Sequence, residues 1–280
     1  TYDSHKLLIT PVSSLNKIMT KLVSVERSFA ILRELIAQEN SSMTEISEEL
    51  DIPSSTMHDH LSKLIELGYV TRDGNQYQPS MRIMELAEHH RQRMPLYQHS
   101  KPQLQDLTNQ IGEHATVMIE ENGLGTLVYT TESDCNVNFA PHPGSQMKLH
   151  RTGEGKAILA YLSEDRRREI VNQHELDNNH SPSVGNRNIP PKTQSTITDE
   201  NELFTELETV REQGYAFASE ELIRGIRSIG VPIISDDSIV MGSIGIYSPV
   251  NKLTDDTFHE EFPDLLLRKA NIIEININYS

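Results

Sequence analysis

The sequence predicts an α+β protein of two domains, and three observations support this class. The chain has 280 residues, which is enough for two modest hydrophobic cores. The first part of the chain reads as helices followed by a β-hairpin, whereas the remainder alternates strands with helices. Pro95 breaks the helical pattern between these parts and predicts the boundary there.

The first domain begins with a helix that starts at Ser24. Its apolar residues recur at intervals of three and four: Val25, Phe29, Leu32, Leu35 and Ile36. Asn40-Ser41-Ser42 ends this helix. The second helix is expected at about Thr44–Leu50, with Thr44 as its N-cap.

The third helix follows the tight turn Asp51-Ile52-Pro53, because proline suits the first turn of a helix, and Gly68 is expected to end it. Asp73-Gly74-Asn75 is a strong hairpin signal between the short strands Tyr69–Arg72 and Gln76–Gln78. Helices and a hairpin in this order predict a winged helix-turn-helix over residues 19–79.

A linker helix is expected within residues 80–96, at Ser80–Arg93, and a second domain over residues 97–280. The strands of that domain are expected at Ala115–Glu120, Gly125–Thr131, Asn136–Ala140, Tyr215–Ala218, Arg227–Ile234 and Ile239–Tyr247. Its helices are expected at Tyr97–Ile111, Gly153–Leu162, Glu164–Gln173, Asp199–Gln213 and Thr254–Ile277, the last interrupted near Pro263. Residues 176–195 are rich in Asn, Ser and Pro and predict an irregular loop.

Acidic residues outnumber basic ones by 41 to 25, which gives a formal charge of −16. Residues 99–280 hold 28 acidic and 15 basic residues, against 12 and 8 in residues 19–98. This balance excludes a general polyanion binder but allows a local nucleic-acid site. The many acids and few lysines resemble the surface composition of proteins from salt-loving organisms, and an archaeal source is one expectation.

The sequence predicts a cytoplasmic protein that does not enter a membrane. No apolar run approaches the length of a membrane span, and no signal-peptide pattern follows the N-terminal lysines. The single cysteine, Cys135, excludes an intramolecular disulfide and a multi-cysteine metal site. Met19 precedes the first patterned segment, so residues 1–18 are expected to be a tail or an upstream extension.

Residues 44–70 carry the strongest functional signal, because a helix-turn-helix places the polar face of its second helix in the major groove. That face is predicted to carry Ser54, Ser55, Thr56, His58, Asp59 and Lys63, and the wing to carry Arg72 and Gln76. Hydroxyl and imidazole groups can bond phosphates or base edges. We predict double-stranded DNA as the partner; the alternative is a helical hairpin that contacts a protein.

Over about residues 23–280 the chain resembles the IclR family of transcriptional regulators. The matching stretches include SVERSFAILRELI, TEISEELDIPSSTMHDHLSKLIELGYV, LHRTGEGKAILAYL, GIRSIGVPI and GSIGIYSP. The resemblance implies a linker helix that leads to a GAF-like effector-binding and oligomerisation domain, with a mostly antiparallel sheet flanked by helices. It also implies a homodimer or homotetramer on a palindromic operator, controlled by a small organic metabolite.

The resemblance further implies the residues that line the effector pocket: Met147, Gly153, Glu154, Ala218, Ile226, Ser228, Gly245 and Tyr247. Gly153-Glu154-Gly155 would open a helix whose free N–H groups can hold a carboxylate. Some family members carry an acid in place of Ala218, a serine in place of Gly245 and an arginine in place of Asp59. The identities of the effector and the operator therefore do not follow from the family.

The remaining patterns predict no further chemistry. Gly153–Lys156 lacks the spacing of a Walker A loop, and Lys156 is expected to be structural or a pocket-edge charge. The histidine clusters show no metal-ligand spacing: His89, His90, His142 and His150. Glu220-Glu221 and Asp236-Asp237 are expected to be solvated, so we predict no catalytic residue, metal or cofactor. Two alternatives stay open: an enzyme that uses the pocket, and a constitutive DNA-architectural or protein-interaction module.

Overall fold

The structure, a computed structural model, describes residues 22–38, 40–131, 142–174, 176, 193–252 and 254–279. The chain divides into two compact units between Met84 and Glu85. Several expectations lie outside the described residues: the tail 1–18, Met19, Cys135, the strand at Asn136–Ala140 and residues 177–192 of the predicted 176–195 loop.

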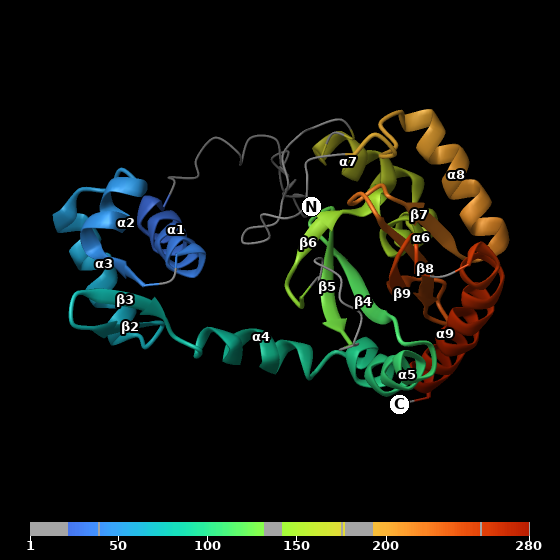
Figure 1. Cartoon of the computed structure of the whole chain (residues 1–280), viewed down its shortest axis with the longest axis horizontal. Coiled ribbons are helices and arrows are strands. Elements are labelled where there is room, and N and C mark those ends of the chain that lie inside the picture. The colour runs from blue at the N-terminus through green and yellow to red at the C-terminus, as the bar shows by residue number, and fades with distance from the viewer. Residues whose placement is uncertain are drawn as a thin grey trace, which may run out of the picture. The chain divides into compact units, whose positions relative to one another are not determined.

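The first unit has the element order that the sequence predicts. Its elements are α1 Val23–Ala37, β1 Ser41–Ser42, α2 Met43–Glu49, α3 Ser54–Glu66, β2 Val70–Asp73 and β3 Gln76–Pro79 (Figure 1). The strands pair antiparallel in the order β1-β3-β2. The turn of the β2–β3 hairpin contains Gly74 with φ of 57°, a conformation that favours glycine. The predicted winged helix-turn-helix is confirmed.

The predicted first helix is confirmed as α1, but its apolar residues do not all face the core of this unit. Ile31 and Leu35 are buried against α3, whereas Val25, Phe29 and Ile36 are exposed. At 100° per residue, the exposed three form a second apolar stripe that lies roughly a third of a turn from the buried one. Only a narrow stripe of α1 faces the core of this unit.

The N-cap predicted for α2 is also wrong. Ser42, not Thr44, caps the helix: its hydroxyl accepts a hydrogen bond from the Glu45 main-chain N–H. The Glu45 carboxylate in turn accepts from the Ser42 main-chain N–H at 2.7 Å. This reciprocal pair is a capping box, and it explains why the helix begins before Thr44.

Helix α4, Ile83–Arg91, is shorter than predicted and buries none of its residues. The next helix, α5, spans Pro95–Ile111 and carries Pro95 in its first turn. Pro95 therefore opens α5 rather than only ending the helix before it, since its missing N–H would have no partner at that position.

The second unit is built on an antiparallel sheet with the strand order β6-β5-β4-β9-β8-β7. The strands are β4 His114–Glu121, β5 Leu124–Thr130, β6 Gln146–Lys148, β7 Ala216–Ser219, β8 Ile226–Ile234 and β9 Val240–Pro249. The helices are α6 Gly153–Tyr161, α7 Glu164–His174, α8 Glu200–Gln213 and α9 Phe262–Asn278, besides α5. Together with the first unit, this confirms the predicted α+β class.

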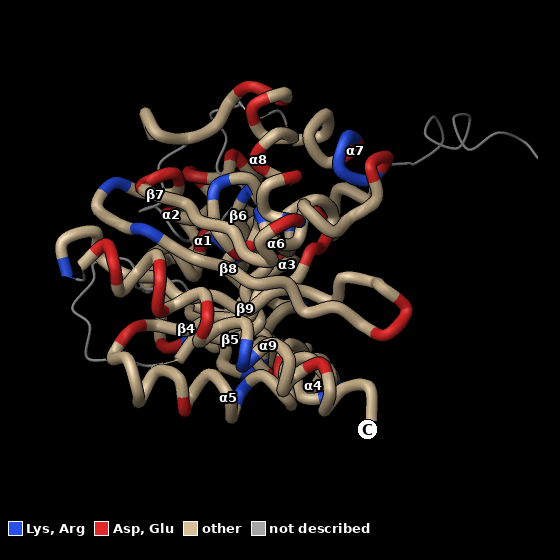
Figure 2. The backbone as a smooth tube through the Cα atoms, turned by 90° about the vertical axis from the view of Figure 1, so that its right-hand side faces the viewer, with Lys and Arg blue, Asp and Glu red and all other residues tan. Residues whose placement is uncertain are grey.

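Helices cover both faces of this sheet. Helices α6, α7 and α8 lie on one face and α5 and α9 on the other, as the two views show (Figure 1, Figure 2). Each face has its own apolar core. One core includes Met118, Leu127 and Leu207, and the other includes Leu104 and Ile244.

Two local features were not predicted, and a third was. The short strand β6 and the 3-10 turn Leu149–Arg151 after it have no signal in the sequence. The interruption predicted near Pro263 is confirmed: a π-helical turn, Thr257–Glu261, precedes α9. Within the residues that the structure describes, no helix has the length and apolar character to cross a membrane.

Candidate DNA-binding surface and effector site

Helix α3 presents polar side chains because the core uses its apolar ones. Met57, Leu61 and Leu64 are buried, and they fix which face of the helix is turned outward. The residues predicted to contact DNA from this helix are accordingly exposed, except Thr56, which is half-buried: Ser54, Ser55, His58, Asp59 and Lys63. The polar face that the sequence predicts is therefore present.

A groove of about 560 Å³ lies between α1 and α3. Its lining residues come from both helices: Ser24, Val25, Arg27 and Ser28 from α1, and Thr56, Asp59, His60 and Lys63 from α3. The Ser28 hydroxyl and His60 Nδ1 are hydrogen-bonded at 2.9 Å and join the two helices. Ser28 and His60 were not predicted, because the contact depends on how two helices pack and not on a local motif.

The cationic side chains that line this groove can bind a phosphate, because their contacts within the protein are weak or absent in the described residues. Lys63 Nζ lies 2.7 Å from Glu66 Oε1, and most of both side chains is exposed to solvent. Such surface pairs contribute about 0–1 kcal/mol, so a phosphate can replace Glu66. Arg27 has no ion-pair partner among the described residues. These two side chains form a cationic pair along one groove.

The two predicted wing residues differ in their surroundings. The exposed Arg72 side chain donates from Nε to the Gly74 carbonyl at 2.7 Å, and its guanidinium lies 5.4 Å from the centre of the Tyr77 ring. Gln76 is half-buried, and its Oε1 is buried without a hydrogen-bond partner in the described part of the chain. Arg72 is thus more accessible to DNA than Gln76.

The residues predicted for the effector pocket gather on the α6 side of the second sheet. Ala218, Ser228 and Tyr247 are cross-strand neighbours and form one row over β7, β8 and β9. Gly245 and Thr116 form part of the next row, on β9 and β4. Met147, Ile226 and Tyr247 belong to the apolar core on this face, which α6 also contacts.

Glu154, in the first turn of α6, has its carboxyl group in the middle of these residues. The side chain is fully buried, and its Oε1 accepts a hydrogen bond from the Thr116 hydroxyl at 2.5 Å. Burial raises the pKa of Glu154 to about 7, although the hydrogen bonds to its carboxyl group act in the opposite direction. The Tyr247 hydroxyl lies near this carboxyl group and donates to Met147 Sδ at 3.7 Å. Thr116 was not among the predicted residues.

The N-terminus of α6 makes its hydrogen bonds within the protein. The Gly153 N–H donates to the Ser228 hydroxyl at 2.9 Å, and the Gly155 N–H donates to the Thr152 hydroxyl at 2.9 Å. Thr152 is the N-cap of the helix. Two of the N–H groups expected to hold a ligand carboxylate are therefore already bonded.

Among the other charged residues near α6, Glu221 differs from its prediction. Lys156 is buried and its Nζ lies 2.6 Å from Glu206 Oε1 and 2.7 Å from Glu221 Oε1. Glu221 was expected to be solvated, but it is buried by this ion pair and its pKa is raised by burial. Asp236 and Asp237 are exposed, as predicted.

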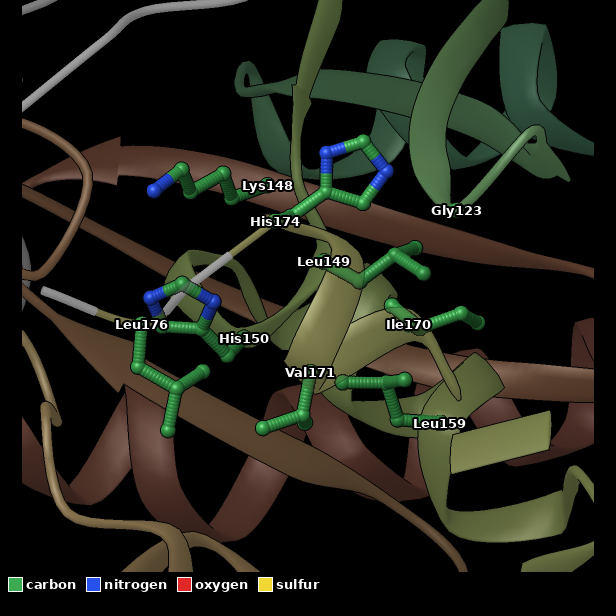
Figure 3. Close-up of a pocket in the computed structure, with 9 residues that line it drawn as sticks. All are labelled: Gly123, Lys148, Leu149, His150, Leu159, Ile170, Val171, His174 and Leu176. Atoms are coloured by element: carbon green, nitrogen blue, oxygen red, sulfur yellow. The ribbon is translucent and has the colours of Figure 1, made fainter. Parts of the chain in front are cut away.

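A small cavity lies between α6, α7 and the β4–β5 turn (Figure 3). Most of its wall is formed by apolar side chains: Leu149, Leu159, Ile170, Val171 and Leu176. The polar groups come from Lys148, His150 and His174. Burial and the neighbouring positive charges lower the pKa of His150 to about 3. The cavity volume, about 10 Å³, holds roughly one water molecule, which is too little for a metabolite.

Among the residues that the structure describes, no three His, Cys, Asp or Glu side chains form a group that could hold a metal ion. His142 is exposed, and its Nδ1 lies 3.0 Å from the Pro143 carbonyl oxygen. The buried His150 and the exposed His142 thus occupy different environments. The site around Glu154 therefore offers hydrogen-bonding groups and a buried carboxyl group to a ligand.

Two family models match the chain. The model described as "Bacterial transcriptional regulator IclR C-terminal" matches residues 89–274. The model described as "IclR helix-turn-helix domain" matches residues 24–74. The two matches fall on the second and the first unit, respectively.

Individual proteins match over nearly the whole chain. A probable HTH-type transcriptional regulator ArcR of Halobacterium salinarum is 29% identical over 92% of this chain and 94% of its own length. This likeness agrees with the salt-loving composition. The solved structure of the Thermotoga maritima IclR protein superimposes with a TM-score of 0.76 at 26% identity, over 92% of this chain and all of that chain. An IclR homologue of Microbacterium hydrocarbonoxydans, solved in complex with 4-hydroxybenzoate, has the same fold, with a TM-score of 0.72 at 20% identity over 92% of this chain and 100% of that one.

Proposed function

Because the chain belongs to the IclR family of transcriptional regulators, we propose that it binds a palindromic operator as a homodimer or homotetramer and that a small metabolite beside α6 controls this binding. Residues 19–79 bind DNA, residues 80–96 link the domains, and residues 97–280 bind the metabolite and assemble the oligomer. The protein acts in the cytoplasm, where its DNA is.

The groove between α1 and α3 carries the DNA-binding half of the proposal. In this assignment Ser54, Ser55 and His58 face base edges, since they are exposed polar residues near the start of α3. Arg27 and Lys63 line the groove and bind phosphates, which position the helix without reading sequence. Arg72, on the wing, makes a further contact with the sugar-phosphate backbone of the DNA.

A fluorescence anisotropy titration tests this half. The full chain is titrated against labelled DNA from upstream of its own gene in a high-potassium buffer, with scrambled DNA of equal length as the control. We expect saturable binding that survives an excess of scrambled competitor. Equal affinity for both DNAs would favour an architectural role, and no binding at any salt would favour a protein-interaction module.

The apolar surface of α4 and of the turn before it supports self-association. The side chains of Met81 in the turn and of Met84 and Leu86 in α4 are 75%, 58% and 63% exposed, and α4 buries none of its residues within the chain. A second copy would cover this surface, and a two-fold symmetric dimer matches a palindromic operator. Sedimentation equilibrium should show a dimer or a tetramer for the wild type and a smaller species for Leu86→Glu. Ile239→Glu, at an equally exposed position in the β8–β9 turn, is the matched control.

The site around Glu154 supports the effector half of the proposal. It gathers hydroxyl, carboxyl and amide groups in an apolar core, which is the composition of a small-molecule site. The 4-hydroxybenzoate in the Microbacterium homologue supports a small organic ligand for this chain as well. A thermal-shift screen of metabolites tests this, since a ligand at about 100 times its Kd adds roughly 2.7 kcal/mol of stability.

We infer that the chain is a regulator and not an enzyme, because its relatives are named as transcriptional regulators. The enzymatic alternative uses the same site, with the first unit as a passenger. Turnover of a metabolite that scores in the thermal-shift screen, followed by product analysis, separates the two. Release of operator DNA without consumption of the metabolite supports regulation.

A further inference from the structure

The centre of the effector site is filled by a group of the protein itself. The Glu154 side chain has no solvent exposure, and its Oε1 is held by the Thr116 hydroxyl at 2.5 Å. The main-chain N–H of Glu154, at the N-terminus of α6, and the Tyr247 hydroxyl also interact with the carboxyl group. Oε2 is buried and accepts no hydrogen bond from any residue that the structure describes.

The surrounding backbone is shaped around this carboxyl group. Gly245, on β9, lies against it so closely that a methyl group there would overlap the side-chain atoms of Glu154. Gly230, on β8, allows the main chain of Gly153 and Glu154 to approach the sheet in the same way. Gly245 thus makes room for the Glu154 side chain and Gly230 for the main chain that carries it, which makes the position of the carboxyl group specific.

These donors are the kind that bind a carboxylate. A hydroxyl group and the N–H groups of a helix N-terminus hold carboxylates and phosphates in many proteins. Here the Glu154 carboxyl group already occupies the Thr116 hydroxyl and its own main-chain N–H. A second carboxylate within hydrogen-bond distance of a buried carboxyl group is disfavoured, because two such charges cannot both ionise in an apolar core. The remaining acceptor, Oε2, favours a donor instead.

We propose that the ionised Glu154 carboxylate is the resident anion of the effector site, and that the site therefore takes a neutral or cationic small molecule that donates a hydrogen bond to Oε2. This inference rests on the proposed function, because it concerns the site through which the metabolite acts. It identifies Glu154 as the specificity-determining residue and excludes free carboxylates as ligands of the wild-type site.

Replacement of the side chain by a free carboxylate tests the proposal. Glu154→Ala removes the carboxyl group and leaves its donors and its space, so acetate should bind there. The thermal midpoints of the full-chain variant and the wild type are measured at pH 8, above the pKa of Glu154, in sodium acetate and in sodium chloride of equal ionic strength. At about four to five times its Kd, acetate should raise the midpoint by roughly 2–4 °C. The wild type should show no rise.

Glu154→Gln is the matched control, because it fills the same space without the charge and should not respond to acetate. A Glu154→Ala protein that folds in acetate but not in chloride supports the proposal. The proposal is overturned if Glu154→Ala does not respond to acetate, if it stays unfolded in both salts, or if the wild type is stabilised by acetate or 4-hydroxybenzoate.

The result is independent of the proposed function. Operator binding does not enter the midpoint measurement, and the anisotropy assay with operator and scrambled DNA is made on the wild type alone. Failure of acetate to bind Glu154→Ala would refute the proposal that Glu154 is the resident anion, and it would leave the proposal of operator binding unaffected. Equal affinity for both DNAs would refute the proposed sequence-specific regulation, and it would leave the acetate result unaffected.

Discussion

In the first unit, the Lys63–Glu66 ion pair leaves 60% and 67% of its side chains exposed, whereas in the second unit the Lys156 side chain is only 1% exposed. Lys156 contacts two carboxylates, and Glu221 is itself nearly buried. Water screens the first pair, so exchanging one partner costs little. Removing one partner of the second pair leaves charge in an apolar core. The charge of Lys63 is thus available to a ligand such as DNA, whereas the charge of Lys156 is committed to contacts within the fold.

The largest expected effect comes from Lys156→Met. The variant leaves the buried Glu221 carboxylate beside Glu206 without its cation, so the free energy of unfolding should fall by about 3–5 kcal/mol. Urea denaturation of the wild type and the variant measures this. Lys63→Met is the control and should have nearly wild-type stability. Equal losses in both variants would break the comparison.

The second effect is a pH dependence of stability that Glu154 causes. Its pKa is about 7 in the folded protein and 4.5 without the protein environment. Between these values the folded chain keeps a proton that the unfolded chain has released, so stability is greatest below pH 4.5 and falls as the pH rises to 7.

The loss from this one group is at most about 3 kcal/mol. Denaturation of the wild type and Glu154→Gln at a series of pH values isolates it, since Gln does not titrate. The stability of the wild type relative to the variant should fall as the pH rises. A difference between the two that is constant from pH 4.5 to 8 would contradict the burial of a titrating carboxyl group.

A smaller effect is expected at the capping box of the first unit. Ser42→Ala removes the hydroxyl that accepts from the Glu45 N–H, which should cost about 1 kcal/mol of stability. Thr44→Ala changes a residue inside the helix and serves as the control. Thermal denaturation compares the two. A greater loss in Thr44→Ala would restore the original N-cap assignment.

The smallest change in stability, with a clear change in binding, is expected for Arg27→Ala. Loss of one phosphate contact should flatten the dependence of log K on log salt by about 0.9. Arg33→Ala, an exposed arginine of α1 that does not line the groove, should leave the slope unchanged. Anisotropy titrations at several potassium concentrations measure both slopes. Equal slopes for the two variants would remove Arg27 from the DNA contact.

The sequence predicts the elements of the first unit well because their signals are local. The turn Asp73-Gly74-Asn75 and the apolar spacing in α3 each lie within a few residues. The N-cap of α2 was misplaced although its signal was present: Glu45 stands three residues after Ser42, which is the spacing of a capping box.

The polar contacts of the second unit are long-range and could not be predicted in this way. Thr116 lies 38 residues from Glu154, and Lys156 lies 65 residues from Glu221. A charged residue in the first turn of a helix is ordinarily solvated, so nothing in the local pattern of Glu154 indicates burial. The family resemblance indicated which residues belong together, but not which group occupies the space among them.

The glycine contacts of α6 also limit how a bound metabolite can move the protein. Because Gly230 and Gly245 have no side chains, the main chain of α6 rests directly on the main chain of β8, and the Glu154 side chain packs directly against the main chain of β9. Such contacts leave little room for sliding or tilting, so we expect α6, β8 and β9 to move as one rigid piece. A response to the metabolite would then be carried by elements at the margin of this piece, where side chains can repack, and the search for a hinge should begin there.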